Sequence, residues 1–310
     1  MQKPAPTVYI ETYGCQMNVS DSELMYGRLE AEGYVSVDSP VGADVVRETA
    51  EVAQRGISEV VLLGQTVNSY HDGTHDFADL LRAVGKVDGI RRVRYTSPHP
   101  NDFSDRVIAA MAETPTVCEH VHLPMQSGST AMLKRMLRRY SREEYLDCVA
   151  RLRAAMPGLG LTTDIIVGFP GETDEEFADT LSLCREVRFD DAFTFKFSPR
   201  EGTPATRMPA EWTIPDDVMD ARYTELLNTI RGIAREKNLR RLGERMEVLV
   251  EKEARKGDLM QARSRDFKTV LVPGGPELVG SYLTVELTGT TGATFTGTPV
   301  QERRPLPMAG

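Results

Sequence analysis

Cysteine is scarce in this sequence and widely spread. The chain of 310 residues contains four cysteines, Cys15, Cys118, Cys148 and Cys184, and the nearest two lie thirty positions apart. Small extracellular domains are usually stapled by closely spaced cysteine pairs, so this distribution excludes a disulfide framework and is typical of a reducing compartment. The histidines also lack a zinc-site spacing relative to any cysteine.

Long apolar runs are missing as well. No stretch reaches the ~20 consecutive apolar residues that a membrane helix needs, and the first ten residues, MQKPAPTVYI, do not form a signal peptide. With 40% hydrophobic and 27% charged residues, the composition is that of an ordinary globular protein. We therefore expect a cytoplasmic monomer without a membrane partner, long enough for two or three domains.

An excess of positive charge is absent too, because the net charge is −9, which argues mildly against a nucleic-acid partner. Basic residues nevertheless gather in two segments. The first comprises Lys134, Arg135, Arg138, Arg139 and Arg142, and the second comprises Arg231, Arg235, Lys237, Arg240, Arg241 and Arg245. Such runs are usually solvated helix faces, but they also suit a phosphate-binding surface, so charge leaves both interpretations open.

The stretch 161–173, LTTDIIVGFPGET, has the pattern of a strand, a turn and a helix. Residues 162–167 are mostly β-branched or apolar, as in a buried strand of a parallel sheet. The glycines at 168 and 171 break the strand, and residues 175–188 follow as an amphipathic helix that begins with acids. This geometry brings backbone N–H groups close to a ligand, although most such units bind nothing.

The same unit recurs along the chain. Predicted strands cover residues 59–63, 92–95, 117–123, 161–167 and 191–197, and predicted helices cover 77–84, 104–112, 130–137, 142–155, 175–188 and 215–241. Strands that alternate with helices predict an α/β fold with a parallel sheet and right-handed crossovers, either an open sheet or a partial barrel.

Each predicted strand is followed by a polar loop that contains glycine or proline, at residues 64–69, 97–101, 124–129, 168–172 and 198–203. Proteins with parallel sheets bind their ligands at the C-terminal ends of the strands, where these loops lie. Any one of these loops alone is best interpreted as an ordinary turn. Five polar loops of similar composition on one rim of the sheet, however, predict a ligand cavity.

The regions on either side of this unit differ from it. Residues 8–12 and 20–33 have strand and helix patterns. Residues 44–46 are predicted to start a strand, which enters a predicted helix at 47–55 without the usual ~2–6 loop residues. After Leu242, short strands at 246–251, 260–262, 269–272, 282–287 and 294–296 predict a small five-stranded barrel. Such barrels often bind oligonucleotides, and a capping domain without a ligand is the alternative.

The sequence strings at these positions resemble those of a known family. They are YGCQMN at 13–18, LLGQTVNSY at 62–70, HLPMQSGS at 122–129, TDIIVGFPGET at 163–173 and SPREGTPA at 198–205. In this order, over nearly the whole chain, they are similar to the radical-SAM tRNA methylthiotransferases. The first string is similar to the branch that makes tRNA-2-methylthio-N6-dimethylallyladenosine (MiaB).

The resemblance implies an N-terminal domain with one 4Fe-4S cluster, a radical-SAM partial barrel with a second, and a C-terminal TRAM domain that binds tRNA. It also implies a reaction, methylthiolation of N6-isopentenyladenosine next to the anticodon of tRNA, with S-adenosylmethionine as a cofactor. On this basis we divide the chain into a truncated N-terminal α/β fragment at 1–46, a partial barrel at 47–241 and a TRAM-like β-barrel at 242–310.

The resemblance also shows what this chain lacks. The family holds its radical-SAM cluster with a Cys-x3-Cys-x2-Cys loop after the first barrel strand, and no such loop occurs here. Of six cluster ligands only Cys15 matches. The pattern is interrupted between Val46 and Arg47, so we predict an internal deletion that removes this loop together with the first barrel strand. We therefore expect no assembled cluster, no catalytic residues and an inactive chain.

The resemblance assigns roles to the remaining motif residues. Cys15 is a vestigial metal ligand. The candidates for S-adenosylmethionine are Gly64, Gln65, Gln126, Ser127, Gly168, Gly171 and Glu172. The candidates for tRNA phosphates are Arg138, Arg139, Arg231, Arg235, Lys237, Arg240 and Arg241.

Structural alternatives remain open: Gly64 forms an ordinary turn, and Glu172 is only an acid at a helix start. Ser129, next to the candidates Gln126 and Ser127, is interpreted as an N-cap. His99 lies between two prolines on the rim, where it either faces substrate or makes a structural hydrogen bond. For the whole chain three hypotheses remain. They are a methylthiotransferase by descent, a catalytically dead tRNA-binding remnant, and an α/β enzyme that uses another cofactor at the same rim.

Overall fold

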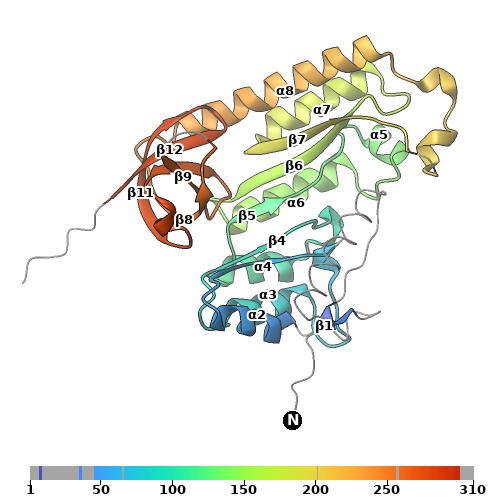
Figure 1. Ribbon diagram of the computed structural model, residues 1–310. Helices are drawn as coiled ribbons and strands as arrows, with labels where there is room; N and C mark the ends of the chain where they lie inside the picture. Colours follow the sequence, from blue (N-terminus) through green and yellow to red (C-terminus); the bar gives the residue numbers. More distant parts are fainter. Residues whose placement is uncertain are drawn as a thin grey trace, which may run out of the picture.

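The computed structural model describes residues 7–8, 35–36, 45–64, 66–200, 202–255 and 258–300. Near the N-terminus, β1 (Thr7–Val8) and β2 (Val35–Ser36) pair in parallel. Most of the other described residues form a helix-covered parallel sheet, with a small closed barrel at one end of it (Figure 1). Among these residues no helix is both long and apolar enough to cross a membrane.

The parallel sheet follows the chain order. Its strands are β3 (Glu59–Leu62), β4 (Arg92–Tyr95), β5 (His120–His122), β6 (Gly160–Val167) and β7 (Asp191–Lys196). β3 pairs with β4, and β5 with β6 and β6 with β7, all in parallel, while a bridge between Val93 and Val117 joins the two groups. This is the α/β arrangement that the alternating pattern predicted.

Helices connect and cover the strands. They are α2 (Val45–Gln54), α3 (Phe77–Gly85), α4 (Asp105–Glu113), α5 (Thr130–Arg135), α6 (Arg142–Ala155), α7 (Asp174–Val187) and α8 (Asp216–Leu239). Short 3-10 turns stand at η2 (Val67–Ser69), η3 (Pro100–Asp102), η4 (Pro204–Arg207), η5 (Ala210–Trp212) and η6 (Pro276–Leu278). α6 and α7 begin with capping boxes, at Ser141 and Thr173, which satisfy otherwise free backbone N–H groups.

The prediction that a strand starts at 44–46 was wrong, because Val45 and Val46 already lie in α2. The Thr49 hydroxyl donates to the Val45 carbonyl at 2.7 Å, and Val45 and Ala53 pack against the core below α2. Burial of one face of the helix outweighs the β preference of two valines. Within the described residues there is therefore no strand that runs into this helix.

The sheet has two different faces. Val93, Val121 and Leu161 point toward the helices and are fully buried. The alternate residues lie on the opposite face, which we call the concave face. Its members include Val61, Leu63, Arg92, Arg94, His120, His122, Thr162, Asp164, Phe193 and Phe195. Phe193 and Phe195, on the edge strand β7, are 59% and 51% exposed, so this face is open to solvent along that edge.

The C-terminal strands form a closed barrel, as predicted. They are β8 (Arg245–Glu253), β9 (Leu259–Ser264), β10 (Thr269–Pro273), β11 (Tyr282–Thr290) and β12 (Thr294–Pro299), in the order β10-β12-β11-β8-β9. Its core is a cluster of buried apolar side chains: Val248, Val250, Met260, Ala262, Val270, Val272, Val285, Leu287 and Phe295. Inward-facing residues alternate with exposed ones along each strand, so the barrel has a filled interior.

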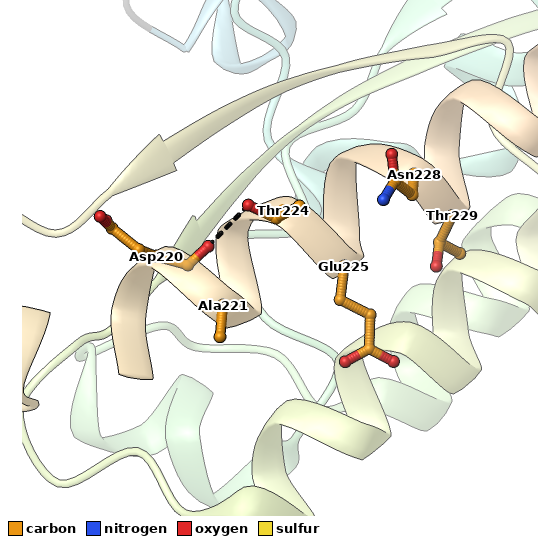
Figure 2. A pocket seen from close by; sticks show the side chains of 6 residues that line it. All are labelled: Asp220, Ala221, Thr224, Glu225, Asn228 and Thr229. Atoms are coloured by element: carbon orange, nitrogen blue, oxygen red, sulfur yellow. Dashed lines mark hydrogen bonds between the residues drawn. The ribbon is translucent and has the colours of Figure 1, made fainter. Parts of the chain in front are cut away.

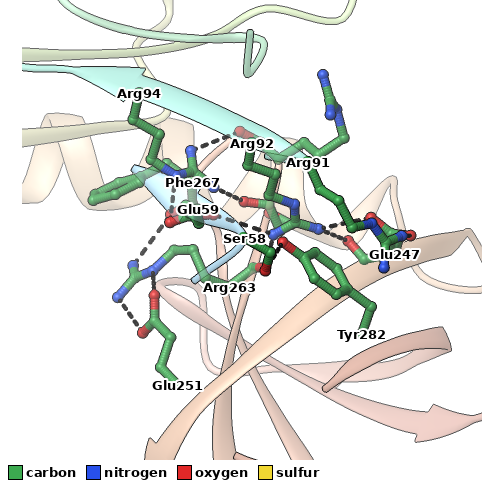
Figure 3. A network of polar contacts seen from close by, with 12 residues as sticks. Ser58, Glu59, Arg91, Arg92, Arg94, Glu247, Glu251, Arg263, Phe267 and Tyr282 are labelled. Atoms are coloured by element: carbon green, nitrogen blue, oxygen red, sulfur yellow. Dashed lines mark hydrogen bonds and ion pairs between the residues drawn. The ribbon is translucent and has the colours of Figure 1, made fainter. Parts of the chain in front are cut away.

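The barrel contacts the sheet at the N-terminal ends of the strands (Figure 3). Arg92 donates to the Arg263 carbonyl at 2.8 Å, and Arg94 donates to the Ser264 and Arg265 carbonyls at 2.7 and 2.9 Å. Phe267, at the tip of the β9–β10 hairpin, stacks on His120 with ring centroids 4.5 Å apart. The barrel therefore closes the end of the concave face that lies opposite the predicted ligand rim.

Candidate functional site

The turn after β6 requires glycine at two positions. Gly168 and Gly171 have φ angles of 75° and 73°, which L side chains rarely adopt. A Cβ on Gly168 would lie 2.6 Å from the Met219 sulfur, and one on Gly171 would lie 3.2 Å from the Trp212 ring. The Gly171 N–H donates to the Trp212 carbonyl at 2.7 Å. Protein groups thus already explain both glycines, and their role toward S-adenosylmethionine stays a prediction.

Glu172 is a buried clamp for this turn. Its Oε2 accepts from the Gly168 N–H and from Arg222 Nη1, both at 2.9 Å. Burial raises the pKa of the Glu172 carboxyl, while the Gly168 N–H and the Arg222 guanidinium act in the opposite direction. The same guanidinium binds exposed Asp174 at 2.7 Å. The carboxylate therefore ties the turn to α8, which is more than a helix-start acid does.

The residues after β5 are also held inside the protein. Gln126 is buried with φ 62°, and its backbone bonds extend the sheet to β6 through Asp164 and Ile166. The Ser127 hydroxyl lies 3.2 Å from the Thr180 hydroxyl. Ser129 caps α5, as its alternative interpretation expected. A backbone as strained as that of Gln126 is found most often at functional sites, and the assignment of Gln126 and Ser127 to the cofactor stays a prediction.

Gln65 and Cys15 lie outside the described residues. Gly64 sits in a tight turn, where an added Cβ would lie 3.1 Å from the Val67 Cα. The side chain of Asn68 donates to the His99 carbonyl at 2.9 Å and accepts from the His99 N–H at 2.8 Å. These bonds join the loops after β3 and β4. His99 also caps η3 with its ring, so a structural hydrogen bond is present there.

The thiols of the described residues do not suit an iron–sulfur cluster. Cys118, Cys148 and Cys184 are free and buried, before β5 and within α6 and α7. Burial raises the thiol pKa of all three, to about 11 for Cys148 and about 12 for Cys184, whereas a ligand must be a thiolate. In the part of the chain that the structure describes, no three His, Cys, Asp or Glu side chains are grouped to hold a metal ion.

Sequence reasoning missed a chain of polar groups on the concave face. Asp164 Oδ2 lies 3.3 Å from His122 Nε2, and Thr162 Oγ1 lies 3.0 Å from His122 Nδ1 and 3.1 Å from His120 Nε2. A carboxylate only accepts, so a neutral His122 donates from Nε2 and accepts the Thr162 proton at Nδ1. His120 then donates to Thr162. The sequence did contain one signal for this arrangement: residues 120 and 122, and residues 162 and 164, are two positions apart on predicted strands and so lie on the same face of the sheet.

His120 makes the stability of the folded chain depend on pH. Burial is the main cause that lowers its pKa to about 3, helped by the charges of Arg94 and Arg263 and by His122, with Asp190 opposing. His120 therefore binds a proton below pH ~6.5 in the unfolded state, but in the folded state it stays unprotonated until the pH falls to about 3. Stability present above pH ~6.5 is lost as the pH falls, by at most ~1.4 kcal/mol per pH unit.

Urea unfolding at about pH 6.5, 5.5 and 4.5 tests this expectation. His120→Phe keeps an aromatic ring against Phe267 and should flatten the acid slope. His71→Phe, at an exposed turn, is the matched control and should leave the slope as in the unmodified chain. Equal slopes in all three proteins would contradict a neutral His120.

The second basic segment contains residues that form ion pairs within the protein and residues that are exposed to solvent. Lys237 binds buried Asp190 at 2.7 Å, and Arg241 pairs with Asp266 and Glu244. Arg240 pairs with Glu236 along the same helix. Arg231 and Arg235 are exposed on α8. Lys237 and Arg241 thus have structural roles, and Arg231 and Arg235 are the members of this set best placed for a phosphate, a role that stays a prediction.

The described surface includes a hollow along α8 and a hollow on the rim. The first is broad, has a volume of about 690 Å³ and is lined by residues of that helix alone: Asp220, Ala221, Thr224, Glu225, Asn228 and Thr229 (Figure 2). No buried polar group faces it, so we assign it no ligand. The other, of about 330 Å³, lies on the rim and is lined by Thr66, His99, Asn101, Asp102, Leu137, Arg138 and Arg139. It includes both arginines of the first basic segment that were predicted to bind RNA.

Comparison with known families agrees with this architecture. The model of the Radical SAM superfamily matches residues 20–184, which is more than half of the chain. The chain belongs to the radical SAM superfamily. The TRAM domain model matches residues 239–300, which contain the closed barrel. The predicted fold class, a radical-SAM α/β unit followed by a small TRAM barrel, is thereby confirmed.

Individual relatives confirm the resemblance to the methylthiotransferases. The radical SAM chain is 45% identical over 264 residues to the tRNA-2-methylthio-N(6)-dimethylallyladenosine synthase of Alkaliphilus oremlandii, covering 84% of this chain and 56% of the relative. It is 48% identical over 252 residues to the protein of the same name from Acidothermus cellulolyticus, covering 79% and 50%. The chain therefore spans about half the length of the curated relatives it matches.

Among solved structures, coproporphyrinogen III oxidase from Escherichia coli, described as a radical SAM enzyme, superposes with a TM-score of 0.47 at 12% identity, covering 96% of this chain and 72% of the other. That likeness is too weak to carry an argument.

Proposed function

We propose that this chain descends from enzymes that methylthiolate N6-isopentenyladenosine next to the anticodon of tRNA, with S-adenosylmethionine and two 4Fe-4S clusters, and that it now binds tRNA without performing this chemistry. The names of the relatives, each a tRNA-2-methylthio-N(6)-dimethylallyladenosine synthase, support the first part. The TRAM match supports the second. The observation that carries the loss of activity is the cysteine set, because only four thiols exist and three are buried apart from one another.

A radical-SAM cluster supplies an electron to the sulfonium of bound S-adenosylmethionine, and it needs three converging thiolates. The described residues offer none, so we derive no step through a cluster. We further propose an internal deletion at the Val46/Arg47 junction, domain limits at 1–46, 47–241 and 242–310, and a monomer in the cytoplasm. Genomic DNA read across the junction tests the deletion, and gel filtration tests the monomer.

Anaerobic reconstitution tests the loss of activity. The full chain is incubated with iron and sulfide, freed of excess reagent, and assayed for bound iron, bound sulfide and reductive cleavage of S-adenosylmethionine. We expect no more iron than in a Cys15→Ala control and no 5′-deoxyadenosine. A stoichiometric cubane cluster that cleaves S-adenosylmethionine would show that the chain is an active enzyme.

Filter binding to isopentenylated tRNA tests the retained function. Affinity should fall steeply between about 50 and 200 mM salt, because phosphate contacts release counterions. A double variant, Arg231→Gln with Arg235→Gln, should bind more weakly than a variant at exposed Arg185, Arg185→Gln. If the unmodified chain does not retain tRNA even at low salt, the proposal of a tRNA-binding remnant is wrong.

A further inference from the structure

The rim hollow is built from two loops that follow the neighbouring strands β3 and β4 and from the segment between α5 and α6. Thr66 comes after β3, His99 and Asn101 come after β4, and Arg138 and Arg139 follow α5. Such convergence of loops at the C-terminal edge of a parallel sheet is the usual setting of a binding site. The sequence predicted that Arg138 and Arg139 contact tRNA phosphates, but it gave no ligand to the hollow as a whole.

Hydrogen bonds hold the hollow in shape before any ligand arrives. The Asn101 amide donates to the Arg139 carbonyl at 2.9 Å and joins the second loop to the segment between α5 and α6. Asn68 joins the first loop to the second through the backbone of His99. The His99 ring packs edge-on against Tyr140 at 5.6 Å, and the Tyr140 hydroxyl donates to the Pro124 carbonyl. A preformed hollow loses little entropy on binding.

The charge of the lining suits a single anion. Arg138 and Arg139 are exposed, and in the described part of the chain no acid forms an ion pair with either. Asp102 is the one acidic residue of the lining. Burial lowers the pKa of His99, the charges of Arg138 and Arg139 lower it further, and Asp102 opposes them. With His99 neutral, the lining carries one net positive charge, which matches one phosphodiester group.

Leu137 stands at the lip of the hollow in an unusual conformation. Its φ is 58°, and the bonds from Arg138 N to the Leu133 carbonyl and from Leu137 N to the Lys134 carbonyl form a Schellman end to α5. Glycine is the usual residue at that position, because a Cβ disfavours the left-handed region. Leu137 is also 69% exposed. A strained, exposed leucine beside two free guanidinium groups suggests an apolar partner next to an anion.

We propose that the rim hollow binds one phosphodiester group of single-stranded RNA, with Arg138 and Arg139 on the phosphate and Leu137 against the adjoining base. A nucleotide is the ligand that presents a monoanion next to a flat apolar surface. The inference rests on the proposed tRNA binding and adds the residues and the strand form that the rim recognises.

Leu137→Gly separates this role from a structural one. In the full chain, glycine should leave the thermal midpoint unchanged or raise it, because the left-handed position no longer carries a Cβ. Affinity for a single-stranded RNA oligonucleotide, measured by fluorescence anisotropy, should fall about threefold to tenfold, as expected for loss of one base contact. Unchanged affinity would overturn the role of Leu137.

The phosphate contact has its own test. The double variant Arg138→Gln with Arg139→Gln should bind the oligonucleotide at least about tenfold more weakly, and its log affinity against log salt should be shallower by about one. Arg185→Gln is the control and should match the unmodified chain. If the double variant keeps the unmodified affinity while the chain still binds tRNA, the inference fails and the proposed function stands; if the unmodified chain binds no RNA, both fail.

Histidine NMR identifies the ligand class. Saturating oligonucleotide should raise the pKa of His99, because an anion then lies beside the imidazole, and the double variant should not show this response. Inorganic phosphate should compete only weakly. Displacement of the oligonucleotide by inorganic phosphate at low millimolar concentration would overturn RNA recognition in favour of a small-anion site.

Discussion

Replacing Arg92 by alanine should lower the free energy of unfolding by about 3–5 kcal/mol. The guanidinium is fully buried, lies 3.2 Å from Glu247 and 3.7 Å from Glu59, and donates to the Arg263 and Glu247 carbonyls. Its removal leaves buried acceptors without donors at the contact between sheet and barrel. Urea unfolding followed by circular dichroism measures the change.

The neighbouring Arg91 provides the matched control. It pairs with the same Glu247 at 2.7 Å, but its side chain is 51% exposed, and it also lies over the Tyr282 ring. Exposed pairs contribute little, so Arg91→Ala should change the free energy of unfolding by no more than about 1 kcal/mol. Similar losses for the two variants would mean that the barrel contact does not depend on burial.

Replacing Glu172 by alanine should have an effect of the same size, about 3–5 kcal/mol. The Glu172 side chain is fully buried and that of Arg222 is 8% exposed, so the substitution removes the buried carboxylate partner of the guanidinium and leaves exposed Asp174 as its remaining ion-pair partner among the described residues. It also releases the Gly168 N–H. Thermal and urea unfolding should both show the loss.

Asp174 is the control for this prediction, because it binds the other nitrogen of the same guanidinium while its side chain is 91% exposed. Asp174→Ala should cost no more than about 1 kcal/mol. If Glu172→Ala unfolds as the unmodified chain does, the carboxylate is not a structural clamp, and ligand binding becomes the better explanation of its burial.

Local patterns predicted most elements of this fold. The alternation of Val93 and Tyr95 with two arginines predicted a strand at 92–95, and the pattern at 142–155 predicted a helix; both agree with the observed bounds of β4 and α6. The helix predicted to start at Ser104 begins one residue later, because Ser104 is the N-cap of α4 and not its first helical residue. The pattern failed at Val45 and Val46, because tertiary burial decides between helix and strand for so short a β-branched run.

The site was less predictable, since its contacts join residues far apart in sequence. The motif at 168–172 indicated a special turn, but the partner that explains Glu172 is Arg222, fifty positions later. In the same way, charge alone could not tell Lys237, which binds buried Asp190, from exposed Arg231. Local periodicity carries information on burial, whereas pairing depends on how the elements pack.

The position of the C-terminal barrel sets a minimum length for any RNA that touches both ends of this molecule. The barrel lies at one end of the sheet (Figure 1) and contacts the starts of the strands. The residues that line the rim hollow include Thr66 and His99, which follow the ends of β3 and β4. β6 has eight residues, which at ~3.3 Å per residue separates the two ends by roughly 25 Å. If both ends bind RNA as proposed, a trinucleotide would be too short to reach from one end to the other, and a longer folded RNA would gain avidity from contacting both.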